Sequence, residues 1–436
     1  MNTRLEEKTV YLNRHLNGWL VGLICFGALI AINCSYLTNP PHWDDIIGLY
    51  NQAVWLAKHH FDVVTLWKQG ECGSNVYPMG ILPYLYAVLY CFFPAGYIHI
   101  FGHLFNIACL AATCGFFFAV LKKYLPAWLA VIWCVAALCE PVMAGRSAAL
   151  GQECPLTAAF AATIFFISAK KYRLALICML LAFFIKLTGI FLIFAFCVWL
   201  FCLWALHGFS LDEMKKNRVV VSTAAGVCCL EIILFWICNI QNNNFFTRVS
   251  PLADKLILYF CLLIPVAGII LAAAMFSAVC GAVLFAVKRH QRKTPFDGWE
   301  LSLFLLILIA GFWVAFLWYE WSLARYIAPV IFPMICLIAI TLINRKLSFL
   351  AGVIIIALGV ANWHGQFYRP VPAVVSRSGE LLERSREYLD IIEQNQILCK
   401  TLEREHFDSP VYAKWPMVQM LSMPEMGYVS QRLPRV

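Results

Sequence analysis

The segment His42-Trp43-Asp44-Asp45 places two adjacent carboxylates directly after the first long apolar run of the chain, residues 18–35. A run of about 20 apolar residues is long enough to cross a bilayer, so we expect the two acids to emerge at a membrane surface. Ionisable groups at a membrane are costly and are usually retained for a function. A carboxylate in this position can act as a general base on an acceptor hydroxyl. The pair therefore indicates chemistry on a lipid-linked substrate.

Three more ionisable side chains are expected at the same face, namely Glu153, Lys186 and Arg325. Cations there can bind a departing phosphate and stabilise the charge that develops on it. The chain has no Gly-rich nucleotide-binding loop, so we expect a donor carried by its own lipid. The whole set suits transfer of a group from a lipid phosphate.

Each of these residues also has a simpler interpretation. Either acid of the pair could cap a helix expected over residues 46–59. Glu153 could be a solvated loop acid before a helix that begins at Pro155. Lys186 and Arg325 could extend to the phosphates of lipid headgroups.

The composition sets the class of protein that must position these residues. Hydrophobic residues make up 62% of the chain and charged residues 13%, with a mean hydropathy of +0.75. Soluble domains carry about 25% charged residues, so the sequence predicts an integral membrane protein. The net charge of +9 comes from short basic bursts between apolar runs. This is the positive-inside pattern, and we expect no nucleic-acid partner.

The cysteines do not form a recognisable framework. Most of the nineteen lie inside apolar runs, where cysteine behaves as a small hydrophobic residue. No pair has the spacing of a zinc site. Cys72 and Cys154 are expected in loops of the outer side, where the two thiols could form a disulfide.

Hydropathy and the basic bursts predict about eleven membrane spans. They are expected over residues 18–35, 98–121, 127–144, 155–169, two spans within 174–206 divided at Lys186, 219–240, one crossing within 256–287, 301–318, 326–343 and 350–361. The stretch 79–93 is expected to lie at the interface. Residues 377–402 have helical periodicity, and turns and short strands are expected over 409–428. The predicted fold is an all-α polytopic membrane protein with outer juxtamembrane helices, a membrane region over 1–362 and a small outer C-terminal region over 363–436.

The order of these motifs resembles the GT-C superfamily of membrane glycosyltransferases, in particular protein O-mannosyltransferases and the lipid A aminoarabinose transferase. The matching features are the acidic pair in the first outer loop, the segment Tyr77-Pro78-Met79-Gly80, the second-loop segment from Arg146 to Pro155, the Lys-x-x-Gly turn at Lys186 and the sequence Arg325-Tyr326-Ile327-Ala328-Pro329. The similarity covers nearly all of the membrane region. The chain departs from the family pattern by having Asp45 where Glu is common, Glu153 where Asp is common, and a single proline at Pro78.

The resemblance implies a role for each matching residue. Asp44 would be the general base on the acceptor, and Asp45 would help to position the acceptor or the sugar. Glu153, His42 and Tyr77 would position the acceptor or the sugar. Arg146, Lys186 and Arg325 would bind the lipid phosphate. No metal or other cofactor is expected, although the carboxylates could hold a divalent ion.

The sequence therefore predicts an inverting glycosyltransferase that moves a sugar from a polyprenyl-phosphate donor to a protein, lipid or glycan acceptor. The expected location is the bacterial inner membrane, with the site on the extracytoplasmic side. Two other functions stay open. One is enzymatic, the transfer of a phospho-group or whole glycan from a lipid pyrophosphate. The other is the transport or flipping of a lipid or glycan. A purely structural subunit is the third alternative, although it would not need the acid pair.

Overall fold

The computed structural model describes residues 17–42, 45–62, 65, 80–207, 222, 226, 298–318, 324–342, 345–361, 363, 386, 388–414, 416–434 and 436. Within these ranges the chain is helical, without a strand, which confirms the all-α prediction. Asp44, Cys72 and Tyr77 lie outside the described residues. So do the spans expected over 219–240 and 256–287, apart from residues 222 and 226.

Two of the described helices are long and apolar enough to cross a membrane. They are α2 (Gly18–Asn33), which continues into the short 3₁₀ turn η1 (Cys34–Tyr36), and α6 (Ala95–Leu121). The two helices pack closely because glycines face each other: a Cβ atom on Gly18 would lie 2.5 Å from the carbonyl oxygen of Gly115. Small residues allow helix backbones to approach in this way.

The predicted span 127–144 is not one straight helix. The chain forms α7 (Ala127–Cys139) and α8 (Pro141–Ala148), and the two axes differ by 70°. Pro141 cannot continue a helix from the preceding turn, and the Glu140 side chain accepts a 3.1 Å hydrogen bond from the backbone N–H of Met143. Residues 145–148, expected in a loop, are therefore helical. Counted as one broken helix, this pair would be a third candidate span.

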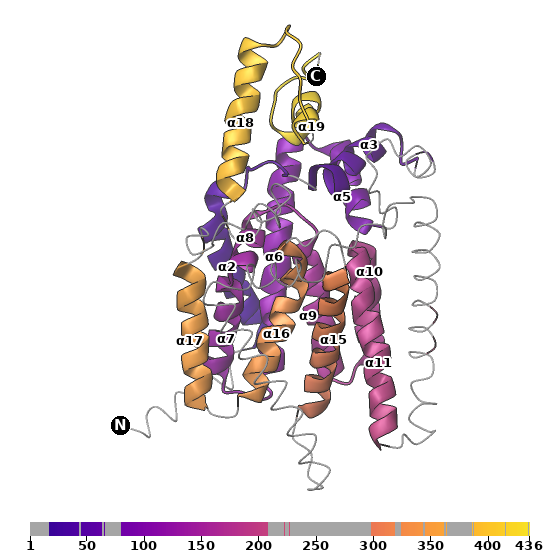
Figure 1. Cartoon of the computed structure of the whole chain (residues 1–436), viewed down its shortest axis with the longest axis vertical. Coiled ribbons are helices and arrows are strands. Elements are labelled where there is room, and N and C mark those ends of the chain that lie inside the picture. The colour runs from indigo at the N-terminus through magenta and orange to yellow at the C-terminus, as the bar shows by residue number, and fades with distance from the viewer. Residues whose placement is uncertain are drawn as a thin grey trace.

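Shorter apolar helices complete a bundle in which most axes run roughly parallel (Figure 1). They are α9 (Glu153–Ser168), α10 (Tyr172–Ile185), α11 (Ile190–His207), α15 (Trp299–Trp318), α16 (Ala328–Thr341) and α17 (Arg345–Ala361). Helix α9 contacts α6, α10 and α16, and α17 packs on α7. The bundle core is aromatic and aliphatic, with contacts such as the edge-to-face pair of Phe117 and Phe332.

The break predicted at Lys186 is confirmed. Helix α10 ends at Ile185, a 3₁₀ turn η3 (Leu187–Gly189) follows, and α11 begins at Ile190. Gly189 is needed there, because a Cβ atom at this position would lie 2.3 Å from the carbonyl carbon of Ala182.

Near the same end of the bundle, three short elements follow the first loop. The helix expected over residues 46–59 forms as a π-helical turn η2 (Ile46–Asn51) and α3 (Gln52–Lys58). Helix α5 (Ile81–Phe92) accounts for the apolar stretch expected at 79–93, and it packs against α3.

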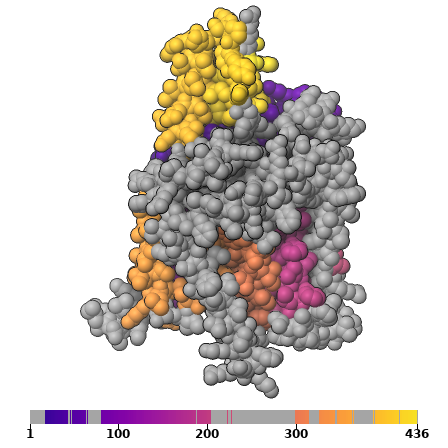
Figure 2. Space-filling view, viewed as in Figure 1, coloured from indigo at the N-terminus to yellow at the C-terminus, as the bar shows by residue number. Residues whose placement is uncertain are grey.

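The C-terminal residues project from this end of the bundle (Figures 1 and 2). They form α18 (Tyr388–Glu405), α19 (Met417–Ser422) and a 3₁₀ turn η5 (Pro424–Met426). The prediction of short strands over residues 409–428 is wrong: the described part of this segment forms no strand and holds α19, turns and extended loop. Tyr428 anchors it to the bundle by donating a 3.0 Å hydrogen bond to the carbonyl of Pro41.

Candidate functional site

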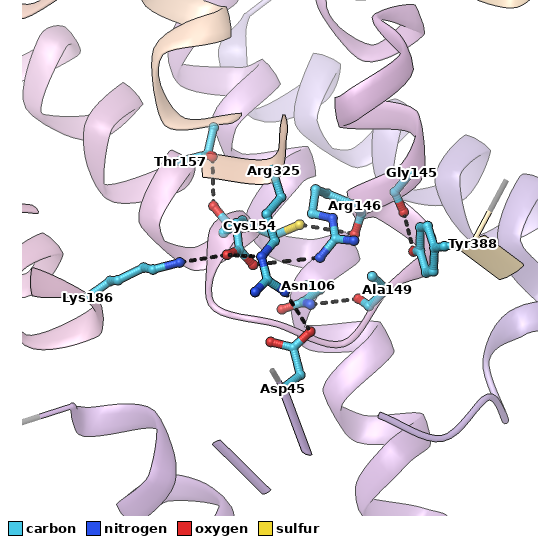
Figure 3. Close-up of polar contacts among 11 residues, drawn as sticks. Asp45, Asn106, Gly145, Arg146, Ala149, Cys154, Thr157, Lys186, Arg325 and Tyr388 are labelled. Atoms are coloured by element: carbon cyan, nitrogen blue, oxygen red, sulfur yellow. Dashed lines mark hydrogen bonds and ion pairs between the residues drawn. The ribbon is translucent and has the colours of Figure 1, made fainter. Parts of the chain in front are cut away.

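Glu153 lies at the centre of a buried cluster of charges. It is the first residue of α9 and is only 2% exposed. Its Oε1 atom accepts a 2.8 Å hydrogen bond from Nζ of Lys186 and lies 3.8 Å from Nε of Arg325. Its Oε2 atom lies 3.9 Å from Nη1 of Arg146. The interpretation of Glu153 as a solvated loop acid is therefore wrong, and the three cations point toward a common centre (Figure 3).

Asp45 extends this cluster on the side of the first loop. Its carboxylate is mostly buried, and Oδ2 lies 3.9 Å from Nη1 of Arg325. Although Asp45 stands at the N-terminus of η2, its side chain makes no capping hydrogen bond, so capping does not account for this acid. The guanidinium of Arg325 thus lies between the carboxylates of Asp45 and Glu153.

Gly151 allows these two acids to share one space. A Cβ atom at this position would lie 2.7 Å from Oε2 of Glu153 and 3.2 Å from Oδ1 of Asp45. Any larger residue would displace one carboxylate or the other. The glycine is therefore required by close approach of side chains.

The three cations differ in exposure. The side chains of Arg146 and Arg325 are 3% and 2% exposed, whereas that of Lys186 is 22% exposed. A buried guanidinium cannot reach lipid headgroups, so that interpretation fails for Arg325. The ammonium of Lys186 lies 4.5 Å from the ring centroid of Tyr326, a cation–π contact. Lys186 is therefore the cation of the three that a ligand can reach from solvent.

Local breaks in the helices bring the charged residues together. Lys186 has an extended backbone at the end of α10, where the helix has stopped. Arg146 lies on α8, which the turn at Glu140 and Pro141 directs across the bundle. Arg325 lies in the 3₁₀ turn η4 (Ala324–Ile327), which precedes α16 and contacts α8.

A narrow cavity of about 10 Å³, room for about one water molecule, borders the cluster. Its lining includes His42, His103, Arg146 and Tyr388 together with Asp45. His42 is 7% exposed. Burial, together with the charges of Arg146 and Arg325, lowers the pKa of His42 to about 3. His42 is therefore a neutral imidazole near pH 7.

Six of the eight site residues expected from the sequence are described, and they lie in one region. Five of them form the charged cluster, and His42 lines the cavity beside it. The other two, Asp44 and Tyr77, lie outside the described residues. Cys154, one of the two cysteines expected in outer loops, carries a free thiol that donates to the carbonyl of Arg146.

The sequence prediction missed the polar face of α6. Nε2 of His103 donates a 3.0 Å hydrogen bond to the carbonyl of Asn39, and Nδ2 of Asn106 donates a 2.9 Å bond to the carbonyl of Ala149. These bonds fix the two loops that precede Asp45 and Glu153. A signal for them was present, because polar residues recur at positions 99, 103 and 106 of an otherwise apolar helix, which is helical spacing.

Comparison with models of protein families, with curated proteins and with solved structures found no significant match. Within the described ranges, no three His, Cys, Asp or Glu side chains are grouped to hold a metal ion. Asp44, the third carboxylate of the expected set, is outside those ranges. What the described cluster offers chemically is two buried carboxylates, two buried guanidiniums and one accessible ammonium.

Proposed function

We propose that this chain is a polytopic membrane glycosyltransferase of the GT-C type that uses a polyprenyl-phosphate sugar. The observation that carries the proposal is the convergence of Asp45 and Glu153 with three cations from separate parts of the chain. Such a set is costly to bury, and groups of this kind are concentrated at functional sites. The neighbouring Asp44 would supply the base, as the resemblance implies.

The proposed topology has eleven spans, with the basic bursts in the cytoplasm. This orientation follows the positive-inside rule and puts the cluster and the C-terminal region on the extracytoplasmic side. In the bacterial inner membrane, a polyprenyl phosphate would approach laterally through the lipid. The acceptor, which is a protein, a lipid or a glycan, would approach from the aqueous side.

The reaction we propose is a single displacement. A hydroxyl oxygen of the acceptor attacks the anomeric carbon of the sugar while its proton passes to the carboxylate of Asp44. The bond between the anomeric carbon and the phosphate oxygen breaks, and its electron pair leaves with the polyprenyl phosphate. Attack opposite to the leaving group inverts the anomeric centre.

The exposure of the cations suggests how they divide the work. Lys186, which a ligand can reach, would contact the phosphate oxygens and stabilise the charge that develops on them. Arg325, which is buried between the two carboxylates, would hold Asp45 and Glu153 in place. Arg146 lines the cavity, and it would act where the acceptor hydroxyl enters.

The experiment is a donor-consumption assay in membranes that contain the protein, with a panel of polyprenyl-phosphate sugars. Asp44→Asn tests the base and Lys186→Met tests the phosphate contact. Arg345→Lys, at an exposed position of α17, is the matched control. If one donor is consumed by wild type and the control but not by Asp44→Asn, the transferase is supported. If wild type moves a donor across the membrane without consuming it, the alternative of a lipid or glycan transporter replaces this proposal.

A further inference from the structure

Tyr388 joins the C-terminal region to the charged cluster. It is the first residue of α18 and is 1% exposed. Its hydroxyl donates a 2.8 Å hydrogen bond to the carbonyl of Gly145. The guanidinium carbon of Arg146 lies 5.1 Å from its ring centroid, and the ring of His42 lies nearly parallel to it, with the centroids 6.4 Å apart.

The same residue forms a wall of the cavity beside Asp45. Ile392 lies one helical turn further along α18 and lines the cavity as well. Positions i and i+4 of a helix share one face, so α18 presents Tyr388 and Ile392 together. The bundle contributes other lining residues, including Ala148 of α8.

This wall is anchored to the bundle through Arg386. Its Nη2 atom donates a 2.6 Å hydrogen bond to Oδ1 of Asn33 on α2, and its Nε atom donates to the carbonyl of Ala144 on α8. The guanidinium also lies 4.9 Å from the ring centroid of Trp363. The start of α18 is thus fixed to two helices of the bundle. The wall that it forms beside the cavity is held in place by these contacts.

We infer that Tyr388 is a specificity-determining residue, which closes the cavity beside Asp45 to bulk water and admits only a hydroxyl group of the acceptor. The space inside the cavity is about 10 Å³, which is room for about one water-sized group, so a single hydroxyl group fits rather than an extended chain. The inference rests on the proposed function. Without the ring, water would reach the anomeric carbon, break its bond to the phosphate oxygen, and yield free sugar and polyprenyl phosphate.

The first experiment compares hydrolysis with transfer. Membranes carrying Tyr388→Ala, Tyr388→Phe or Tyr412→Ala receive the polyprenyl-phosphate sugar that wild type consumes, and free sugar is measured separately from transferred sugar. Tyr412 is 89% exposed in the same region and is the control. For Tyr388→Ala we expect the ratio of free to transferred sugar to rise about tenfold. Tyr388→Phe keeps the ring and should keep the low ratio. An unchanged ratio in Tyr388→Ala overturns the inference.

The second experiment does not depend on the donor. Ala148→Cys places a thiol in the cavity wall, where the native side chain is 1% exposed, and a small water-soluble methanethiosulfonate labels accessible thiols. We expect protection of the introduced thiol in the Ala148→Cys protein and rapid labelling when Tyr388→Ala is added. Peptide mass spectrometry identifies the labelled site. The native Cys399, buried in α18, reports whether the C-terminal region has unfolded.

The two experiments separate the possible failures. If labelling follows the expectation but no donor is consumed, Tyr388 is a wall of the cavity and the proposed function is wrong. If the cavity thiol stays protected after Tyr388→Ala while Cys399 is protected too, Tyr388 is not the wall. If Cys399 becomes labelled, the milder Ile392→Ala on the same face replaces Tyr388→Ala, with the same two outcomes deciding the matter.

Discussion

The Nζ atom of Lys186 donates a 2.8 Å hydrogen bond to Oε1 of Glu153, and this bond joins the break between α10 and α11 to the first turn of α9. Arg146 and Arg325 also lie close to Glu153, so one carboxylate faces three cations, of which Arg325 also faces Asp45. The position of each cation therefore depends on that carboxylate.

Replacing Glu153 should destabilise the protein strongly. Glu153→Gln keeps the shape of the side chain but leaves the buried charges of Arg146 and Arg325 without this counter-ion. Breaking a buried ion pair by removing one partner costs about 3–5 kcal/mol. The measurement is the melting temperature in detergent, which should fall by several degrees.

An exposed acid in the C-terminal region provides the comparison for that substitution. Glu405 pairs with Arg404, and its side chain is 50% exposed. Exposed pairs contribute about 0–1 kcal/mol, so Glu405→Gln should leave the melting temperature almost unchanged. Equal effects of the two substitutions would contradict a special role for the buried cluster.

Exchange of Arg325 for lysine should impair activity although the charge is kept. Two different nitrogen atoms of its guanidinium face the two acids, Nη1 toward Asp45 and Nε toward Glu153. A lysine has one compact ammonium and cannot face both carboxylates in this geometry. We expect donor consumption by Arg325→Lys to fall at least about tenfold, which corresponds to about 1.4 kcal/mol in the barrier. Arg345→Lys is the control, and full activity of both variants would remove Arg325 from the site.

The sequence was sufficient to predict that the charged residues meet, but not how they are held. The apolar runs and the positive-inside pattern can be read from composition along the chain, and they predicted that Glu153, Lys186 and Arg325 lie at one membrane face. The burial of Glu153 could not be predicted. The sequence also fits a helix that begins at Pro155 and leaves Glu153 in a loop, whereas α9 begins two residues earlier, at Glu153 itself. The contact of Tyr388 with Arg146 joins residues 242 positions apart, and no local pattern encodes such a pairing.

The bend in the predicted span 127–144 illustrates the same limit. Pro141 made a helix break predictable, and Glu140 stood next to it, but the 70° angle depends on packing of α8 against α2, α6 and α9. The short strands expected near the C-terminus do not form, for a related reason. A strand needs a partner, and this segment instead packs its Met420, Leu421 and Met426 side chains into the core.

The stability of the protein should decrease as the pH falls below about 6.5, in part because of His42. Its pKa is lowered to about 3 in the folded chain by burial and by the charges of Arg146 and Arg325. Between pH 3 and pH 6.5 the unfolded chain therefore binds a proton that the folded chain does not. Stability from this group is complete above pH 6.5 and is lost toward pH 3, with a slope of up to about 1.4 kcal/mol per pH unit.

The measurement is the change in melting temperature between pH 7 and pH 5. In His42→Asn this change should be smaller than in wild type, because the asparagine does not titrate. His406→Asn, at an exposed position after α18, controls for the substitution itself. A pH dependence in His42→Asn that equals that of wild type would contradict the buried neutral imidazole.

A single methyl group at position 151 should disturb both acids of the site. In Gly151→Ala the new Cβ atom would lie 2.7 Å from Oε2 of Glu153 and 3.2 Å from Oδ1 of Asp45, so at least one carboxylate must move away from Arg325. Overpacking of this kind costs about 1–3 kcal/mol, and donor consumption should decrease as the melting temperature falls. Gly27→Ala is the matched control, because a Cβ atom there meets nothing within 4 Å. Gly27 lies inside α2, where alanine is favoured over glycine by up to about 1 kcal/mol. The same chemical change should therefore lower stability and activity at position 151 and leave activity intact at position 27, and a harmless Gly151→Ala would show that the two carboxylates do not share this space.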